Sequence, residues 1–120
     1  MAKILVVDDE KMICEEFRGL LEEDHHQVDI ALGGEEAIQK VKDTHYDLVF
    51  LDVLMPRMEG REVLDQIKKV SKAAVVIMSG YLPPNKEKEV KSLGAAACFS
   101  KPLELNRVRE FIRSFEAEKK

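Results

Sequence analysis

Acidic residues follow two apolar segments of this chain, at the point where each segment ends. Asp8 and Asp9 come directly after residues 3–7, and Asp52 comes directly after residues 47–51. Short segments of this kind are typical of strands buried in a parallel sheet. Ligands of open parallel sheets bind outside the carboxyl ends of the strands, so we expect the three carboxylates at one edge.

A hydroxyl and an ammonium group follow two further apolar segments. Ser79 comes after residues 74–78, and Lys101 comes after residues 95–100. Two carboxylates about 4 Å apart repel by roughly 4 kcal/mol at an effective dielectric constant near 20, so a cluster of them favours a cation. Mg²⁺ prefers oxygen ligands and needs few from the protein. The sequence therefore predicts a site for Mg²⁺ and a phosphoryl group.

Each of these residues also has a purely structural interpretation. Asp8 and Asp9 can cap the helix that follows them, because Asp is favoured at that position. Asp52 and Ser79 can form turns, and Lys101 can be an ordinary surface lysine. The functional interpretation is favoured by the joint placement, since each position follows a separate strand.

Length and composition indicate one globular domain over residues 1–120, with 45% hydrophobic and 35% charged residues. The net charge of −4 argues against direct nucleic-acid binding, which needs clustered Lys and Arg. No apolar segment reaches membrane-spanning length, and the start of the chain does not resemble a signal peptide. Cys14 and Cys98 have no metal-ligand spacing and are expected to be packing residues in a reducing, cytoplasmic setting.

Strand-like and helix-like segments alternate along the whole chain. A further strand is expected at residues 27–32. Apolar residues recur with a helical period in four segments, which are residues 10–22, the segment after Gly33-Gly34, the segment after Gly60 and the segment from Leu105. This alternation predicts right-handed crossovers and a parallel sheet covered on both faces.

The segment between Ser79 and Gly94 has the weakest pattern, because only Val90 and Leu93 offer apolar contacts in a charged stretch. Packing stabilises such a helix only modestly. It can be a solvated surface helix, or a segment that moves when the nearby site is occupied.

Together these motifs resemble the receiver domain of bacterial two-component response regulators over essentially the whole chain. The matching pieces are Asp8-Asp9, residues 52–60, Ser79-Gly80 and residues 94–102. The resemblance implies an α/β, flavodoxin-like, doubly wound (βα)5 fold with a five-stranded parallel sheet in the order 2-1-3-4-5. It implies a phosphorelay switch, either a stand-alone domain or one excised from a longer regulator.

The resemblance also implies roles for single residues. Asp52 is the phospho-acceptor, and its carboxylate takes a phosphoryl group from a phosphohistidine of a sensor histidine kinase or phosphotransfer protein. Asp9, Asp52 and the backbone carbonyl of Leu54 ligate Mg²⁺, and Asp8 acts through a bound water. Phosphorylation then changes contacts with an effector or a second copy of the chain, so the domain is a switch and not a turnover enzyme.

Lys101 and Ser79 are assigned to the phosphoryl group by the same resemblance. The ammonium group neutralises charge on the phosphoryl oxygens, and the hydroxyl donates a hydrogen bond that draws its loop inward. The Lys101–Pro102 peptide is expected to be cis.

One position departs from the family pattern. The family usually has Tyr or Phe three residues before the lysine, where this chain has Cys98. Phe99 points to the opposite face of its strand and is expected in the core. Tyr81 is a candidate coupling residue, and a tyrosine that only lines the pocket mouth is the competing interpretation.

Three other functions fit parts of the pattern. Phosphatases and phosphotransferases of the haloacid dehalogenase type carry a second Asp two residues after the nucleophile, where this chain has Leu54. In a flavin-binding module, the acidic residues 8–10 would repel the flavin phosphate. A degenerate receiver that binds partners without phosphorylation stays open because of Cys98.

Overall fold

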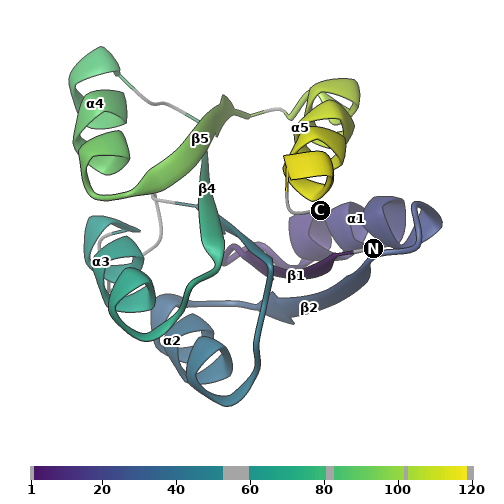
Figure 1. Ribbon diagram of the computed structural model, residues 1–120, viewed down its shortest axis with the longest axis horizontal. Helices are drawn as coiled ribbons and strands as arrows, with labels where there is room; N and C mark the ends of the chain where they lie inside the picture. Colours follow the sequence, from purple (N-terminus) through teal and green to yellow (C-terminus); the bar gives the residue numbers. More distant parts are fainter. Residues whose placement is uncertain (1, 53–59, 81–82, 102, 119–120) are drawn as a thin grey trace.

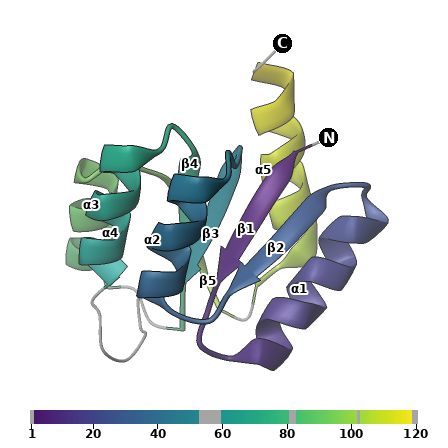
Figure 2. The ribbon, with the colours of Figure 1, turned by 90° about the horizontal axis from the view of Figure 1, so that it is seen from below.

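The computed structural model describes residues 2–52, 60–80, 83–101 and 103–118. Its five strands form one parallel sheet in the order β2-β1-β3-β4-β5, so the predicted topology is confirmed (Figure 1). The strands are β1 (Lys3–Val7), β2 (Gln27–Ala31), β3 (Leu48–Asp52), β4 (Ala74–Ser79) and β5 (Ala95–Ser100). All of them run in one direction, so their carboxyl ends meet at one edge of the sheet (Figure 2).

Helices cover both faces of the sheet, with α1 and α5 on one face and α2, α3 and α4 on the other (Figure 1). They are α1 (Lys11–Glu23), α2 (Gly34–Asp43), α3 (Gly60–Val70), α4 (Pro84–Ser92) and α5 (Leu105–Glu118). In the part of the chain that the structure describes, no helix combines the length and the hydropathy needed to cross a bilayer.

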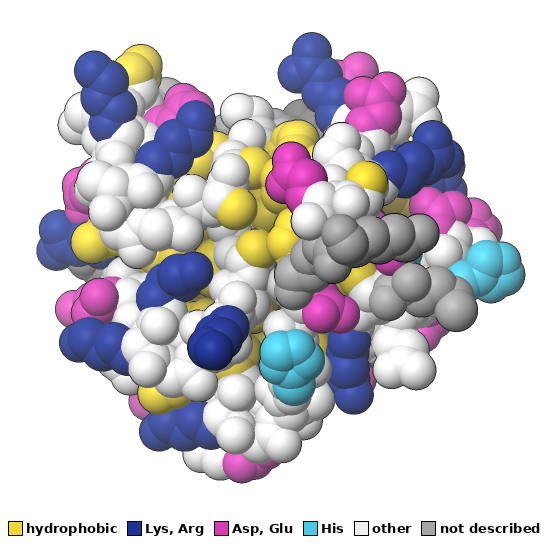
Figure 3. Space-filling model, in the orientation of Figure 1, with side chains coloured by type: hydrophobic (Ala, Val, Ile, Leu, Met, Phe, Trp, Pro, Cys, Tyr) yellow, Lys and Arg dark blue, Asp and Glu magenta, His cyan; other side chains and the backbone are white. Residues whose placement is uncertain are grey.

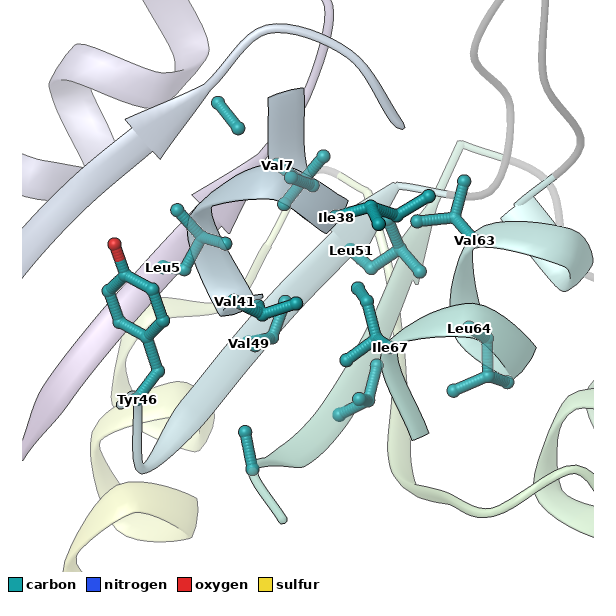
Figure 4. Packing of buried hydrophobic residues seen from close by; sticks show 14 of the residues in the cluster. Leu5, Val7, Ile38, Val41, Tyr46, Val49, Leu51, Val63, Leu64 and Ile67 are labelled. Carbon is teal, nitrogen blue, oxygen red and sulfur yellow. The ribbon is translucent and has the colours of Figure 1, made fainter. Parts of the chain in front are cut away.

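Successive strand residues contribute to two separate cores, because side chains alternate between the faces of a strand. In β1, Leu5 and Val7 pack under α2 and α3, whereas Ile4 and Val6 pack under α1 and α5. Figure 4 shows the first of these cores. Burial of one such side chain contributes about 1.5–3 kcal/mol, so the central strands need apolar residues on both faces.

Two strands extend one residue farther than the sequence predicted. The pairing of β3 with β4 continues to Asp52, and the pairing of β4 with β5 continues to Ser79. Buried backbone groups need hydrogen-bond partners, and the ladder supplies them to its last position. Both polar side chains are therefore part of the sheet edge and are buried, which argues against a simple turn role.

Helix α4 has the weak packing that its sequence indicated. Val90 is its buried residue, and Arg61 at the start of α3 forms an ion pair with Glu89 at 2.9 Å. The helix lies on the surface, and its movement on occupation of the site stays a prediction.

On the face shown in Figure 3, Lys and Arg side chains are interspersed with Asp and Glu.

Tyr46 forms a part-buried polar contact with β2, on the face of the sheet covered by α2. Its side chain is 1% exposed, and its hydroxyl donates a 2.7 Å hydrogen bond to Asp29 Oδ2. Burial raises the pKa of Tyr46, and the hydrogen bond to Asp29 and its charge raise it further. The neutral phenol is therefore the form that the fold stabilises.

We expect Tyr46→Phe to lower the free energy of unfolding by about 1–2 kcal/mol at neutral pH, because Asp29 loses its donor. The folded-state pKa lies above the unfolded value near 10, so the contribution of the phenol is complete below about pH 10. Above that pH the wild type loses about 1.4 kcal/mol per pH unit from this group. Urea unfolding between pH 7 and pH 11 checks whether the gap between the two proteins closes, and a constant gap contradicts the prediction.

Candidate functional site

The ammonium group of Lys101 lies between two buried carboxylates at the carboxyl edge of the sheet. Its Nζ atom is 2.5 Å from Asp8 Oδ2 and 2.9 Å from Asp52 Oδ2. Asp8 is fully buried and Asp52 is 4% exposed. The three residues follow or end β1, β3 and β5, and the chain topology brings them together across separations of 93 and 49 residues.

The charges in this cluster stabilise the protonated lysine. Burial lowers the pKa of Lys101, but its hydrogen bonds to Asp8 and Asp52, together with their charges, outweigh burial and hold the pKa above its usual value. Two carboxylates and one ammonium group leave one excess negative charge at a buried edge. Such an edge attracts a further cation.

Asp9 lies beside this cluster and is exposed. Its carboxylate, that of Asp8 and that of Glu10 have oxygen atoms within 4.8 Å of one another. Desolvation raises the pKa of Asp9, and a hydrogen bond with Asp8 and the charges of Asp8 and Asp52 raise it further. A bound cation would favour the ionised form of Asp9. The clustered carboxylates offer the oxygen ligands that a hard divalent ion prefers.

The capping interpretation of Asp8 and Asp9 does not describe the observed start of α1. Glu10 is the N-cap residue, and its side chain makes no capping hydrogen bond. Asp8 instead accepts a hydrogen bond from the Glu10 backbone N–H at 3.0 Å, which orients its carboxylate. Glu10 was not predicted as a member of the acidic cluster, although its place directly after Asp8 and Asp9 was a usable signal.

Ser79 is placed at the same edge by its strand. It is fully buried, and its backbone carbonyl accepts a 2.6 Å hydrogen bond from the Lys101 backbone N–H. This bond joins the ends of β4 and β5, so the positions of Ser79 and Lys101 depend on each other.

Cys98 and Phe99 point to opposite faces of β5, as predicted. Cys98 packs against the core under α2, α3 and α4, and Phe99 packs against the other core, edge to face with Phe111 at 5.9 Å between ring centroids. Burial raises the pKa of Cys98, and Glu87 of α4 adds to this while Lys91 opposes it. The thiol therefore occupies the side of β5 that faces α4.

Three sequence predictions concern residues outside the described ranges. They are the backbone carbonyl of Leu54 as a metal ligand, Tyr81 as a coupling residue, and the cis peptide between Lys101 and Pro102.

An apolar groove of about 550 Å³ opens beside Lys101, between α1 and the segment that leads into α5. It is lined by Ile13, Glu16, Phe17, Leu20, Lys101, Leu103 and Leu105. Lys101 therefore belongs both to the charged cluster and to the wall of the groove. Through Lys101, whose ammonium group contacts Asp52, the groove adjoins the charged cluster.

The sequence matches the response regulator receiver domain family over residues 4–113. The chain belongs to this family. The receiver fold, the strand order and the clustered residues at the strand ends agree with that assignment. This membership favours the receiver interpretation over the phosphatase and flavin-binding alternatives.

The relatives of this receiver domain differ in length. The chain is 38% identical over 103 residues to the transcriptional regulatory protein CpxR homolog of Haemophilus influenzae, covering 86% of this chain and 45% of that protein. It is 32% identical over 114 residues to sporulation initiation phosphotransferase F of Bacillus subtilis, covering 94% and 92%. The chain thus spans about half the length of several curated relatives that it matches, the CpxR homolog among them.

A solved structure of similar fold is the response regulator TrrA from Thermotoga maritima in complex with Mg²⁺-BeF. It is 34% identical to this chain, with a TM-score of 0.85, and the match covers 96% of this chain and 99% of TrrA.

Proposed function

We propose that this receiver domain is a phospho-accepting switch of a two-component phosphorelay, with Asp52 as the acceptor. The observation that carries the proposal is the 2.9 Å contact between Lys101 Nζ and Asp52 Oδ2 at a buried edge. A cation already in contact with the nucleophilic carboxylate is well placed to stabilise charge that arrives with a phosphoryl group.

The transfer step uses the carboxylate of Asp52 as a nucleophile. One of its oxygens attacks the phosphorus of a phosphohistidine, the P–N bond breaks, and its electron pair leaves with the imidazole nitrogen. The product is an acyl phosphate on Asp52. Lys101 neutralises negative charge on the transferred oxygens, and the Ser79 hydroxyl donates a hydrogen bond to the new phosphate.

The donors suit Mg²⁺, because Asp8, Asp9 and Glu10 bring hard carboxylate oxygens within 4.8 Å of one another. The carboxylates of Asp8 and Asp52 also outnumber the one ammonium group that they share, that of Lys101. Asp9, Asp52 and the Leu54 carbonyl would hold the ion, and Asp8 would contact it through water. When bound, Mg²⁺ supplies positive charge that balances the phosphoryl oxygens. The Mg²⁺-BeF complex of the similar regulator TrrA supports this proposal.

The phosphoryl donor is proposed to be a sensor histidine kinase or a phosphotransfer protein. A phosphohistidine must come within attacking distance of Asp52. The groove gives a partner an apolar surface next to Lys101, whose ammonium group contacts Asp52. Similarity to a phosphotransferase of the sporulation pathway supports such a donor. The domain then acts as a switch that is modified once, and not as a turnover enzyme.

Intact-mass measurement tests the proposed function directly. Incubation of the wild-type chain with acetyl phosphate and Mg²⁺ should add the mass of one phosphoryl group, and EDTA should prevent the addition. Absence of the increment, both with acetyl phosphate and with a kinase that phosphorylates other receivers, would overturn the proposal.

We expect Asp9→Ala to weaken Mg²⁺ binding by about tenfold or more, because it removes one of the few protein oxygens that are proposed to bind the ion directly. Calorimetric titration of the chain with Mg²⁺ measures the effect. Asp43→Ala is the matched control, since Asp43 is an exposed carboxylate in α2. Equal affinities for the Asp9 variant and the wild type would remove Asp9 from the site.

A further inference from the structure

We propose that Cys14 is a positioning residue of the metal and phosphoryl site, acting through a hydrogen bond from its thiol to the backbone carbonyl of Asp8. The inference rests on the proposed function, because it concerns how the ligands of that site are held. The sequence suggested only a packing role for this cysteine.

The thiol of Cys14 lies close to the acidic cluster of Asp8, Asp9 and Glu10, because it contacts the backbone of Asp8. Cys14 lies in the first turns of α1 and is fully buried, and its Sγ atom is 3.4 Å from the Asp8 carbonyl oxygen. It belongs to the core between the sheet and the pair α1 and α5. The contact spans six residues, so it fixes the connection between β1 and α1.

Every other polar group of Asp8 is also held in place. Its backbone N–H donates to the Ala31 carbonyl at 3.1 Å, one carboxylate oxygen accepts from the Glu10 N–H, and the other contacts Lys101. The thiol adds the contact to the backbone carbonyl. Asp8 is thus restrained at four points, and a fully buried residue with so many restraints has little freedom to reorient.

The restraint reaches Asp9 through the peptide bond. The carbonyl of Asp8 and the amide nitrogen of Asp9 belong to one planar group, so the direction of that carbonyl sets the plane from which Asp9 continues. A change in that direction would shift the Asp9 carboxylate relative to Asp8 and Asp52 and so alter the arrangement of the proposed ligands. Cys14 therefore affects metal affinity without contacting the metal.

A thiol is a weak donor, so its loss should alter the site more than the overall stability. Cys14 also packs in the core with Phe17, and a pure packing role is the competing explanation. Cys14→Val separates the two, because valine fills similar space and cannot donate. Cys14→Ser keeps a donor, and Cys98→Ala is the control for removal of a thiol elsewhere.

The first test detects the hydrogen bond itself in metal-free protein. The S–H stretching bands of the two cysteines are measured by infrared spectroscopy and assigned with Cys14→Ala and Cys98→Ala. We expect the Cys14 band at lower frequency than that of a free thiol, because its proton is shared with the Asp8 carbonyl. A Cys14 band at the free-thiol position would overturn the proposal.

The second test measures Mg²⁺ affinity by calorimetry, with urea unfolding in EDTA to verify that each variant is folded. We expect Cys14→Val to weaken Mg²⁺ binding by about tenfold, as for other groups that orient metal ligands. Cys14→Ser should recover part of the loss, and Cys98→Ala should match the wild type.

The outcomes separate this inference from the proposed function. Wild-type Mg²⁺ binding with an unchanged affinity in folded Cys14→Val would overturn the role of Cys14 and leave the function standing. Failure of the wild type to bind Mg²⁺ would overturn the proposed function as well.

Discussion

Asp52→Asn is expected to abolish phosphoryl uptake completely, so that acetyl phosphate and Mg²⁺ leave the intact mass unchanged. An amide is not a nucleophile of comparable strength, and it cannot form the acyl phosphate. Asn has nearly the shape of Asp and removes one of two negative charges beside Lys101, so the fold should be retained. Intact-mass spectra over a time course give the measurement, and circular dichroism verifies folding.

The control for this experiment is Asp43→Asn, which changes an exposed carboxylate in the same way. It should take up one phosphoryl group at the rate of the wild type. If Asp52→Asn still gains the mass and peptide mapping places it on Asp8 or Asp9, the acceptor has been assigned wrongly.

Lys101→Met is expected to have the largest effect on stability. It removes the cation shared by Asp8, which is fully buried, and Asp52, which is 4% exposed. Loss of one partner of a buried ion pair costs about 3–5 kcal/mol, because the remaining charge stays without compensation. We therefore expect the free energy of unfolding in EDTA to fall by about that amount, and Mg²⁺ to restore part of it.

Lys101→Met should also slow phosphoryl uptake by a factor of about 10²–10³, which is the usual effect of removing one group that stabilises developing charge. Urea unfolding with and without Mg²⁺ and rates of mass increase provide the two measurements. Lys101→Arg keeps the charge and should lose less stability, and Lys42→Met controls for loss of an exposed lysine. A similar loss of stability in Lys42→Met would show that the buried contacts are not its cause.

The strands were the most predictable part of the fold, for a physical reason. β1, β3 and β4 lie between two layers of helices, so both faces of each strand carry apolar residues and the segments stand out in the sequence. The order of the strands came from the resemblance to receiver domains. The last paired residues, Asp52 and Ser79, depend on the register with neighbouring strands, which local sequence does not specify.

The site was predictable as a set of residues but not as a set of contacts. The sequence indicated that Asp8, Asp52 and Lys101 share one edge, because each follows a separate strand. The direct ion pair between Lys101 and Asp8 was not predicted, since it depends on side-chain directions across 93 residues. The thiol contact of Cys14 was missed for a similar reason, because it depends on the residue at which α1 begins.

Within the described residues, α4 is attached by the buried side chain of Val90 and the ion pair between Glu89 and Arg61, and this weak attachment has a consequence for evolution. Substitutions at exposed positions such as Lys88 and Lys91 should change the folding free energy by no more than about 0.5 kcal/mol. Selection can then change the exposed surface of α4 so that it recognises new partners, while the buried residues of the phosphoryl site stay the same. A cell with many paralogous copies of such a module would diversify its outputs here first, and at little risk to any of them.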